Sequence, residues 1–148
     1  ISSAELVKNI EQFNKAVTNV KPGGEIVLAN GTWTDVELVF KAKGTANKPV
    51  ELKAQTPGKV IITGRSNLAF SGEYITVSGL VFKNGYSPGR YTITFQKNSK
   101  NVAHHSRISE IVIDNYSNSA DLNETKDWVN LSGTNNRVDH SYFANKNL

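Results

Sequence analysis

The sequence predicts an all-β fold, a right-handed parallel β-helix (a solenoid) with an N-terminal amphipathic helix as its cap. Three observations predict it. Short segments rich in β-branched residues follow one another from Glu25 onward. Equivalent apolar residues recur in these segments at intervals of 24 to 31 residues. The chain also holds seventeen Asn and eleven Gly, which favour frequent corners. We expect one domain over residues 1–148.

The first predicted element is a capping helix over about residues 2–20. Ser2 followed by Glu5 has the pattern of a capping box, and Pro22 with two glycines marks the end. A solenoid exposes unpaired strands and apolar core at its ends, so this helix is expected to cover the N-terminal end. Its apolar face is predicted to consist of Leu6, Ile10, Phe13, Val17 and Val20.

The repeat is clearest in three blocks of eleven residues, 74–84, 105–115 and 135–145, which align without gaps. No helical segment occurs inside the repeat, which excludes helical solenoids. Two apolar columns are expected to face inward, and a column of Asn is expected to stack at a corner. The columns are Val77, Ile108 and Val138, preceded by Leu28 and Leu52; Phe82, Ile113 and Phe143; and Asn84, Asn115 and Asn145.

The later coils are longer than the first, and we place their additional residues in loops over residues 85–91 and 118–127. Such loops project from a rigid stack and are expected to carry function. The chain stops at Leu148, shortly after an Asn corner, with its last coil unfinished. We therefore expect an incomplete fragment whose open end is covered by the C-terminal remainder of the protein or by another chain.

Composition excludes several classes of protein. The formal net charge of +4 makes an acidic partner plausible, but the basic residues are scattered, so nucleic acid is not expected. Without Cys there is no disulfide framework or thiolate metal site. No apolar stretch approaches the ~20 residues of a membrane span. The start at Ile1 without Met is consistent with a mature protein that has lost a signal peptide, hence secreted or periplasmic, or with an engineered start.

Arg107 and Arg137 are the first candidates for substrate binding. With Thr76 they form an outward column in which equivalent residues of adjacent coils lie ~4.8 Å apart. Two stacked guanidinium groups repel each other unless a carboxylate lies between them. That carboxylate could belong to a uronic acid ligand, or to Asp139 or Glu110 of the protein itself.

Tyr86 and Arg90 flank Pro88-Gly89 and could supply an aromatic platform and a carboxylate clamp for a sugar. A solvated loop is the alternative interpretation. The three His residues lack neighbours at metal-ligand spacing, so no metal site is predicted. Two carboxylate pairs, Asp35 with Glu37 and Glu124 with Asp127, have no evident partner in a neighbouring coil, and surface solvation is the better interpretation.

The chain resembles polysaccharide lyase family six, the alginate lyases and chondroitinase B, along essentially its whole length. The opening residues 20–33, VKPGGEIVLANGTW, carry the resemblance first. Further motifs follow in the family's order: DVEL at 35–38, PVELKA at 49–54, PGKV at 57–60, TG at 63–64 and GLVFKNG at 79–85. The segments FQKNSKNV at 95–102 and NRVDHSYF at 136–143 resemble the alginate lyase branch more closely.

The resemblance implies calcium-assisted β-elimination on an acidic, uronate-containing polysaccharide, with alginate as the first candidate. In that family the catalytic Lys and Arg, and the Asn and Glu residues that hold calcium, lie in later coils. No catalytic or metal residue is therefore assigned here, and the chain alone is expected to be inactive. Lys146 could border the cleft. Ser106 and Ser141 stand where relatives often have Cys, which is expected to affect core packing only.

Two alternatives remain open. The family could act here on a glycosaminoglycan such as chondroitin or dermatan sulfate. Alternatively, the chain could belong to a non-catalytic carbohydrate-binding or adhesin solenoid. The residues themselves indicate architecture more clearly than reaction.

Overall fold

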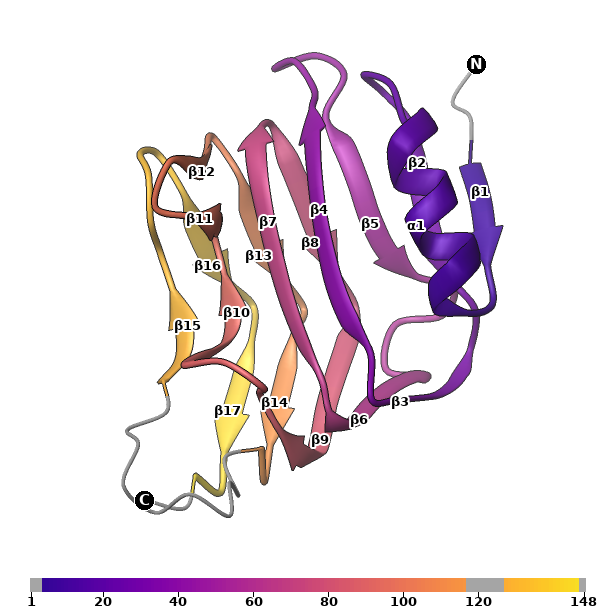
Figure 1. The fold of residues 1–148 in the computed structure, drawn as a ribbon, viewed down its shortest axis with the longest axis vertical. Helices are drawn as coiled ribbons and strands as arrows, with labels where there is room; N and C mark the ends of the chain where they lie inside the picture. Colours follow the sequence, from indigo (N-terminus) through magenta and orange to yellow (C-terminus); the bar gives the residue numbers. More distant parts are fainter. Residues whose placement is uncertain (1–3, 117–126, 147–148) are drawn as a thin grey trace.

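The computed structural model describes residues 4–116 and 127–146, and within them the predicted parallel β-helix is confirmed. The strands form three sheets in which neighbouring strands come from successive coils (Figure 1). Almost every pairing is parallel; β11 (Gln96–Asn98) with β12 (Asn101–His104) is the antiparallel exception among these residues. No helix in this part of the chain has the length and apolar character needed to cross a membrane.

The first sheet runs in the order β1-β2-β5-β8-β13-β16. Ile108 pairs with Val77 on one side and with Val138 on the other, which confirms that inward column. Leu28 was placed wrongly: the residue in register with Leu52 is Ile26. Ile26 and Leu28 lie two residues apart, and both are apolar and point inward. The alternation of inward and outward residues therefore could not show which of them aligns with Leu52. The strands are β1 (Ala4–Val7), β2 (Glu25–Leu28), β5 (Val50–Ala54), β8 (Ile75–Ser78), β13 (Arg107–Ser109) and β16 (Arg137–Asp139).

The second sheet, β17-β14-β9-β6-β3, contains the other predicted column. Ile113 pairs with Phe82 and with Phe143, as predicted. The strands are β3 (Gly31–Thr34), β6 (Val60–Arg65), β9 (Leu80–Tyr86), β14 (Val112–Asp114) and β17 (Tyr142–Ala144).

The Asn corner lies at the end of this sheet. Asn84, Asn115 and Asn145 have φ values of 55°, 53° and 57°, the left-handed region that Asn tolerates better than most residues. The side-chain amide of Asn115 donates to Oδ1 of Asn84 at 2.9 Å, so the first two form the expected ladder. Asn145 departs from it, because its amide donates to Asp114 Oδ1 at 2.8 Å.

The third sheet joins β4, β7, β10 and β15, with the pair β11 and β12 beside β7. The chain leaves the sheet after β10, turns back as β11 and β12, and pairs again with the far part of β7. We call this segment the excursion, residues 96–104. The strands are β4 (Glu37–Lys43), β7 (Asn67–Glu73), β10 (Tyr91–Thr94), β11 (Gln96–Asn98), β12 (Asn101–His104) and β15 (Asp127–Asn130).

The capping helix α1 spans Ile10–Asn19, so the predicted start at residue 2 was wrong. Ala4–Val7 instead forms β1, which pairs with β2 and adds a strand to the first sheet. The N-cap is Asn9, whose Oδ1 accepts from the backbone N–H of Gln12 at 2.8 Å. Gln12 in turn accepts from the N–H of Lys8 at 2.8 Å. This local pair, and not Ser2 with Glu5, begins the helix.

A row of aromatic rings joins the helix to the core. Phe13 of α1 meets Phe40 edge-on with ring centroids 6.0 Å apart, Phe40 stacks on Phe70 at 5.7 Å, and Phe70 contacts Phe95 at 4.7 Å. All four rings are almost completely buried. The helix therefore covers the apolar interior at the end where the chain begins, as predicted for a cap (Figure 1).

Serine hydroxyls connect successive coils inside the corners. The Ser106 hydroxyl accepts from the N–H of Ile75 in the preceding coil at 3.2 Å and donates to the His104 carbonyl at 3.0 Å. Ser141 does the same with the Ile111 N–H and the Asp139 carbonyl. Ser106 and Ser141 thus hold hydrogen bonds between coils, beyond the packing role expected for them.

Candidate functional site

The outer face of the first sheet carries a cluster of charged residues from its last two described coils. Arg107 in β13 lies beside Thr76 in β8 and Arg137 in β16, which confirms the predicted column. Each of these residues alternates with a buried or partly buried apolar neighbour, such as Ile108, so strand periodicity turns the arginines outward. We call Arg107, Arg137 and Asp139 the arginine cluster.

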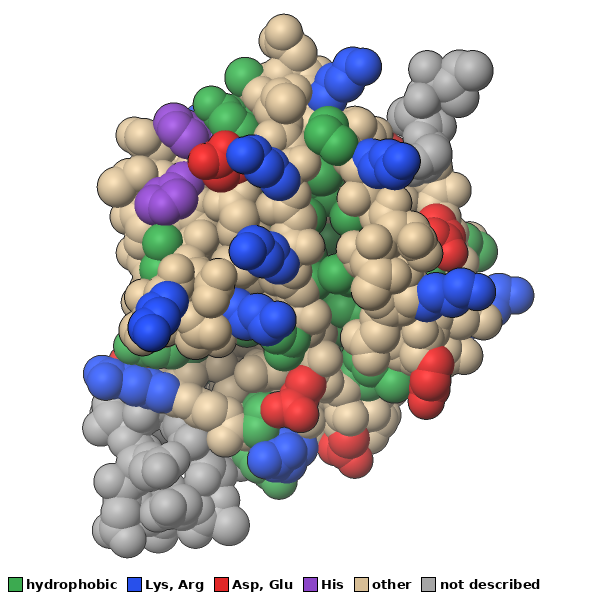
Figure 2. Space-filling model, turned by 45° about the horizontal axis from the view of Figure 1, so that its top comes forward, with side chains coloured by type: hydrophobic (Ala, Val, Ile, Leu, Met, Phe, Trp, Pro, Cys, Tyr) green, Lys and Arg blue, Asp and Glu red, His purple; other side chains and the backbone are tan. Residues whose placement is uncertain are grey.

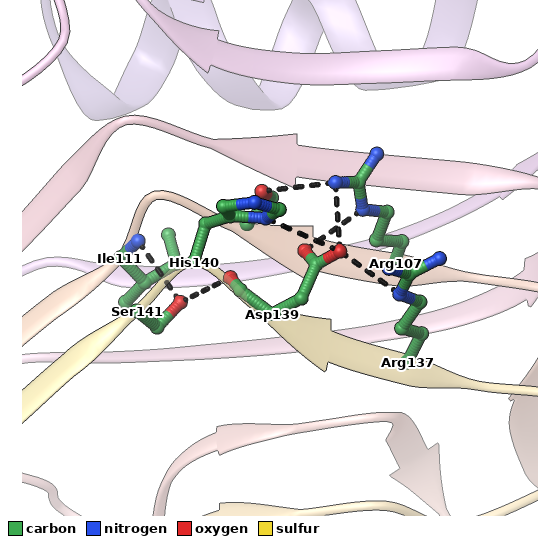
Figure 3. Close-up of polar contacts among 7 residues, drawn as sticks. Arg107, Ile111, Arg137, Asp139, His140 and Ser141 are labelled. Atoms are coloured by element: carbon green, nitrogen blue, oxygen red, sulfur yellow. Dashed lines mark hydrogen bonds and ion pairs between the residues drawn. The ribbon is translucent and has the colours of Figure 1, made fainter.

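Asp139 supplies the carboxylate between the two guanidinium groups, one of the possibilities left open by the sequence. Arg107 donates from Nε to Oδ1 at 2.9 Å and from Nη2 to Oδ2 at 2.8 Å. Nε of Arg137 lies 2.9 Å from Oδ2 (Figure 3). The hydrogen bonds from Arg107 lower the pKa of Asp139 to about 2, so its side chain is ionised at neutral pH.

The two arginines differ in what they have left to offer. Arg107 makes a two-bond contact with Asp139, and its Nη2 also lies 3.3 Å from the Ser109 hydroxyl. The side chain of Arg137 is 67% exposed, against 42% for Arg107, and Asp139 is the one carboxylate that it contacts within the described residues. Two guanidinium groups on one carboxylate leave an excess positive charge, and the outer N–H groups of Arg137 can meet a further anion.

On the outer face of the first sheet, the charge changes sign along the axis of the β-helix. Toward the N-terminal end, Glu51 lies in register with Thr76, and Glu25 with Glu51. Lys53 Nζ contacts Glu25 Oε1 at 2.9 Å, and its hydrogen bond with Glu25 raises the pKa of Lys53. A hydrogen bond between the carboxyl groups of Glu25 and Glu51 raises the pKa of Glu51. The part of this face that can bind an anion is therefore confined to the arginine cluster.

The other predicted substrate-binding residues lie around β15 and β9. Arg90 contacts Asp127 at the start of β15, with Nε 3.0 Å from Oδ2, and its guanidinium lies 5.4 Å from the centre of the Tyr91 ring. The Lys146 ammonium lies 5.5 Å from the ring centre of Trp128, the next residue along β15. Tyr86 ends β9 and is partly buried. The predicted loop over residues 85–91 is shorter than expected, because β9 runs to Tyr86.

The structure therefore places the five predicted substrate-binding residues on different sheets of the β-helix. Arg107 and Arg137 share the first sheet, whereas Arg90 and Lys146 contact adjacent residues of β15 in the third. A role of any of them in substrate binding stays a prediction. The second predicted loop, residues 118–127, lies outside the described residues except for Asp127.

The histidines have structural contacts. Nδ1 of His104 accepts from the Thr134 N–H at 3.1 Å, and His105 stacks on Tyr74 with ring centroids 4.8 Å apart. Nδ1 of His140 lies 3.4 Å from Asp139 Oδ2. Across residues 4–116 and 127–146, no three His, Asp or Glu side chains are grouped so as to hold a metal ion. The described residues therefore do not fit a calcium site.

Sequence reasoning missed a groove on the third sheet. About 830 Å³ in volume, it lies between α1, β4, β7 and the excursion. Figure 2 shows Lys and Arg side chains gathered beside a hollow in which hydrophobic side chains are exposed. The alternation of Lys41 and Lys43 with buried Phe40 and Ala42 signalled an outward basic strand. Nothing in the sequence signalled that the excursion would form the opposite wall.

Comparison with known proteins identifies the family. The chondroitinase B family model matches residues 7–148. No curated protein gives a significant match. Among solved structures, the PL6 family alginate lyase AlyGC is 48% identical with a TM-score of 0.92. That alignment covers 96% of this chain and 19% of AlyGC.

Two further structures agree. A mannuronic acid specific family 6 lyase from the human gut microbiota is 35% identical, with a TM-score of 0.86, over 98% of this chain and 34% of that chain. A PL6 family polysaccharide lyase from Pseudopedobacter saltans is 31% identical, with a TM-score of 0.83, over 93% of this chain and 30% of that chain. The chain thus spans between 19% and 34% of the length of these relatives. Over residues 7–148 it belongs to the chondroitinase B family of PL6 polysaccharide lyases.

Proposed function

We propose that the protein containing this chain is a lyase that cleaves an acidic, uronate-containing polysaccharide by β-elimination, with alginate as its substrate. The observation that carries the proposal is the arginine cluster, where the outer guanidinium N–H groups of Arg137 have no hydrogen-bond partner among the described residues. The chain is similar to alginate lyases, whose substrate carries carboxylates. A planar guanidinium binds the carboxylate of a uronate through two parallel hydrogen bonds.

This chain contributes binding and orientation in that proposal. Arg107 fixes Asp139, Asp139 orients Arg137, and Arg137 holds a sugar carboxylate at a defined place on the coil. Because its pKa is lowered to about 2, Asp139 has no proton to donate and is too weak a base to remove a C5 proton, so the cluster binds the substrate without performing the proton transfer.

The chemistry at C5 needs groups that the described residues do not supply. A proton beside an ionised carboxylate is too weakly acidic to remove unless that carboxylate is neutralised. A calcium ion bound by residues other than those described here would supply that neutralisation. A Lys outside the described residues would take the C5 proton, while the C4–O bond breaks and the glycosidic oxygen leaves as a protonated hydroxyl. A charged polymer does not diffuse across a membrane unaided, so the proposed place of action is the periplasm or the exterior.

The proposed function is tested by incubating the intact natural protein with alginate, dermatan sulfate and an uncharged glucan. Cleavage by elimination leaves unsaturated sugar ends that absorb ultraviolet light. We expect their appearance with alginate, their loss on chelation and their recovery with added calcium. Substituting Arg137→Ala should raise KM about tenfold, the loss of one charged contact of ~1.5 kcal/mol.

Other outcomes would replace the proposal. Unsaturated ends from dermatan sulfate alone would establish the glycosaminoglycan alternative, which the name of the matching family model favours. Binding of a uronate polymer without cleavage under any condition would establish a non-catalytic carbohydrate-binding solenoid. Activity unaffected by chelation would remove calcium from the proposal while leaving the elimination reaction in place.

A further inference from the structure

The groove on the third sheet lies between helix α1 on one side and the excursion on the other, and part of its lining is apolar. Helix α1 contributes Val17, and Val20 follows directly after it; Val39 of β4 and Val102 of β12 also line the groove. Its volume of about 830 Å³ lies in the range of sites that hold small molecules or short segments of a polymer. None of its lining residues belongs to the arginine cluster, so the groove is a separate feature of the surface.

Four lysines surround the groove. Lys41 and Lys43 point outward from β4, where they lie in register with Ser71 and Glu73 of β7. Lys97 and Lys100 come from the excursion, on the other side. All four side chains are exposed, and Glu73 is the one carboxylate among the described lining residues.

These lysines lack counter-charges. Within the described part of the chain, no carboxylate lies at ion-pair distance from any of the four ammonium groups. Like charges around a concave surface raise its positive potential, and low-dielectric walls concentrate that field. An extended anion laid along the groove would relieve the repulsion.

Ser71 is a second, independent sign of a polar ligand. It lines the groove and is only 1% exposed, yet its hydroxyl oxygen has no hydrogen-bond partner among the described residues. Buried hydroxyl groups are almost always hydrogen-bonded, so an unsatisfied one beside a cavity indicates a missing partner. A sugar hydroxyl would supply it.

We propose that this groove binds a segment of the acidic polysaccharide, away from the arginine cluster. The carboxylates of successive uronates meet Lys41, Lys97 and Lys100. The apolar faces of the sugar rings pack on the valine side chains, and a sugar hydroxyl reaches Ser71. The inference rests on the proposed function for the identity of the polymer, and it assigns that polymer a second contact surface.

The test uses the intact natural protein and a charge-matched pair of variants. Lys97→Ala with Lys100→Ala removes two charges from the groove, whereas Lys59→Ala with Lys83→Ala removes two exposed charges outside it. Two measurements are made: retardation in gels that contain alginate or polyglutamate, and initial rates on polymeric alginate and on a short oligosaccharide.

We expect the groove variant to lose most of its retardation by alginate and to show a fivefold to tenfold higher KM on the polymer. Its kcat, its KM on the short oligosaccharide and its melting temperature should match those of the control variant. A groove variant identical to the control in retardation and polymer KM would overturn the inference. Equal loss of retardation on polyglutamate and alginate would also overturn it, because the groove would then select charge alone.

Failure of the inference and failure of the proposed function give different results. If the wild-type protein is retarded by alginate through the groove lysines but never cleaves a uronate polymer, the lyase proposal fails and the groove remains. If it cleaves alginate and the groove variant behaves like the control, only the groove proposal fails. If the wild-type protein is neither retarded by alginate nor able to cleave a uronate polymer, both fail.

Discussion

Arg107 of one coil holds Asp139 of the next through two hydrogen bonds of 2.9 and 2.8 Å. This contact makes two neighbouring arginines unequal, because Arg107 is committed to the fold while Arg137 keeps outer N–H groups for another anion. It also joins β13 to β16 through side chains, in addition to their backbone ladder. Two predictions follow from this asymmetry and two from the packing of the coils.

The first concerns pH. Because the pKa of Asp139 is lowered to about 2, its ion pairs contribute stability above the ordinary carboxyl range near 3.8 and lose it as the pH falls toward 2. Asp139→Asn should therefore lower the melting temperature at pH 5 to 7, and the difference from wild type should vanish near pH 2. Thermal melts across this range measure it. Glu37→Gln is the control, because Glu37 is exposed and makes no ion pair within the described residues. A pH-independent difference for Asp139→Asn would contradict the prediction.

The second separates the two arginines. Arg107→Ala should lower the melting temperature by several degrees, because Asp139 loses both hydrogen bonds from Arg107. Arg137→Ala should change it by no more than about 2 °C, since exposed ion pairs contribute ~0–1 kcal/mol. Thermal melts at neutral pH provide the comparison. Equal destabilisation by the two substitutions would show that both arginines serve the fold alike.

The third concerns the serine that joins two coils. Ser106→Ala leaves the buried N–H of Ile75 without its acceptor and should cost ~1–3 kcal/mol in the free energy of unfolding, measured by urea denaturation. The free energy of unfolding of Ser106→Cys should lie between those of the wild type and of Ser106→Ala, because a thiol is a weak acceptor. Ser78→Ala is the control: its hydroxyl makes no hydrogen bond within the described residues. A Ser106→Ala protein as stable as the control would mean that water replaces the lost contact.

The fourth concerns a close approach of two strands. Gly72 in β7 has φ of +119°, and a Cβ there would overlap the carbonyl oxygen of Ala42 in β4. Gly72→Ala should cost at least ~3 kcal/mol or abolish folding. Gly58→Ala is the matched control, because Gly58 also has a positive φ, +84°, but no atom lies within 4 Å of the added Cβ. That substitution should cost only ~1–2 kcal/mol. Soluble yield and urea denaturation measure both, and similar losses would attribute the effect at Gly72 to φ alone.

The repeat could be predicted from the sequence because apolar residues recur in it at regular intervals. Val77, Ile108 and Val138 recur at equivalent places, and successive residues of a strand point to opposite faces, so both the stacking and the outward turn of Arg107 and Arg137 followed. The first coil was less certain, because inward residues two apart satisfy the same pattern. Leu28 was therefore chosen in place of Ile26.

The start of the helix was mispredicted for a comparable reason. Two capping patterns precede it, and both Leu6 and Val7 can serve a strand as well as a helix. The strand is favoured because β2 offers a free edge, a tertiary contact that local pattern does not contain.

The candidate site was only partly predictable. The partner of Arg107 and Arg137 could be named as one of a few carboxylates because strand register limits the possibilities. The groove could not be foreseen, since it depends on where the excursion folds back against β7. Such a return depends on turn geometry and not on periodicity.

The left-handed corner at Asn84, Asn115 and Asn145 divides each of the three aligned coils into a segment of constant length and a segment whose length varies. The path from the first sheet to the corner has the same number of residues in each aligned coil. The path from the second sheet onward differs, with a far longer connection between β14 and β15 than between β9 and β10. In these coils, residues can thus be added after the second sheet, and in the excursion after the third, while the rungs keep their spacing. Surface diversity can accumulate at these places without disturbing the stack.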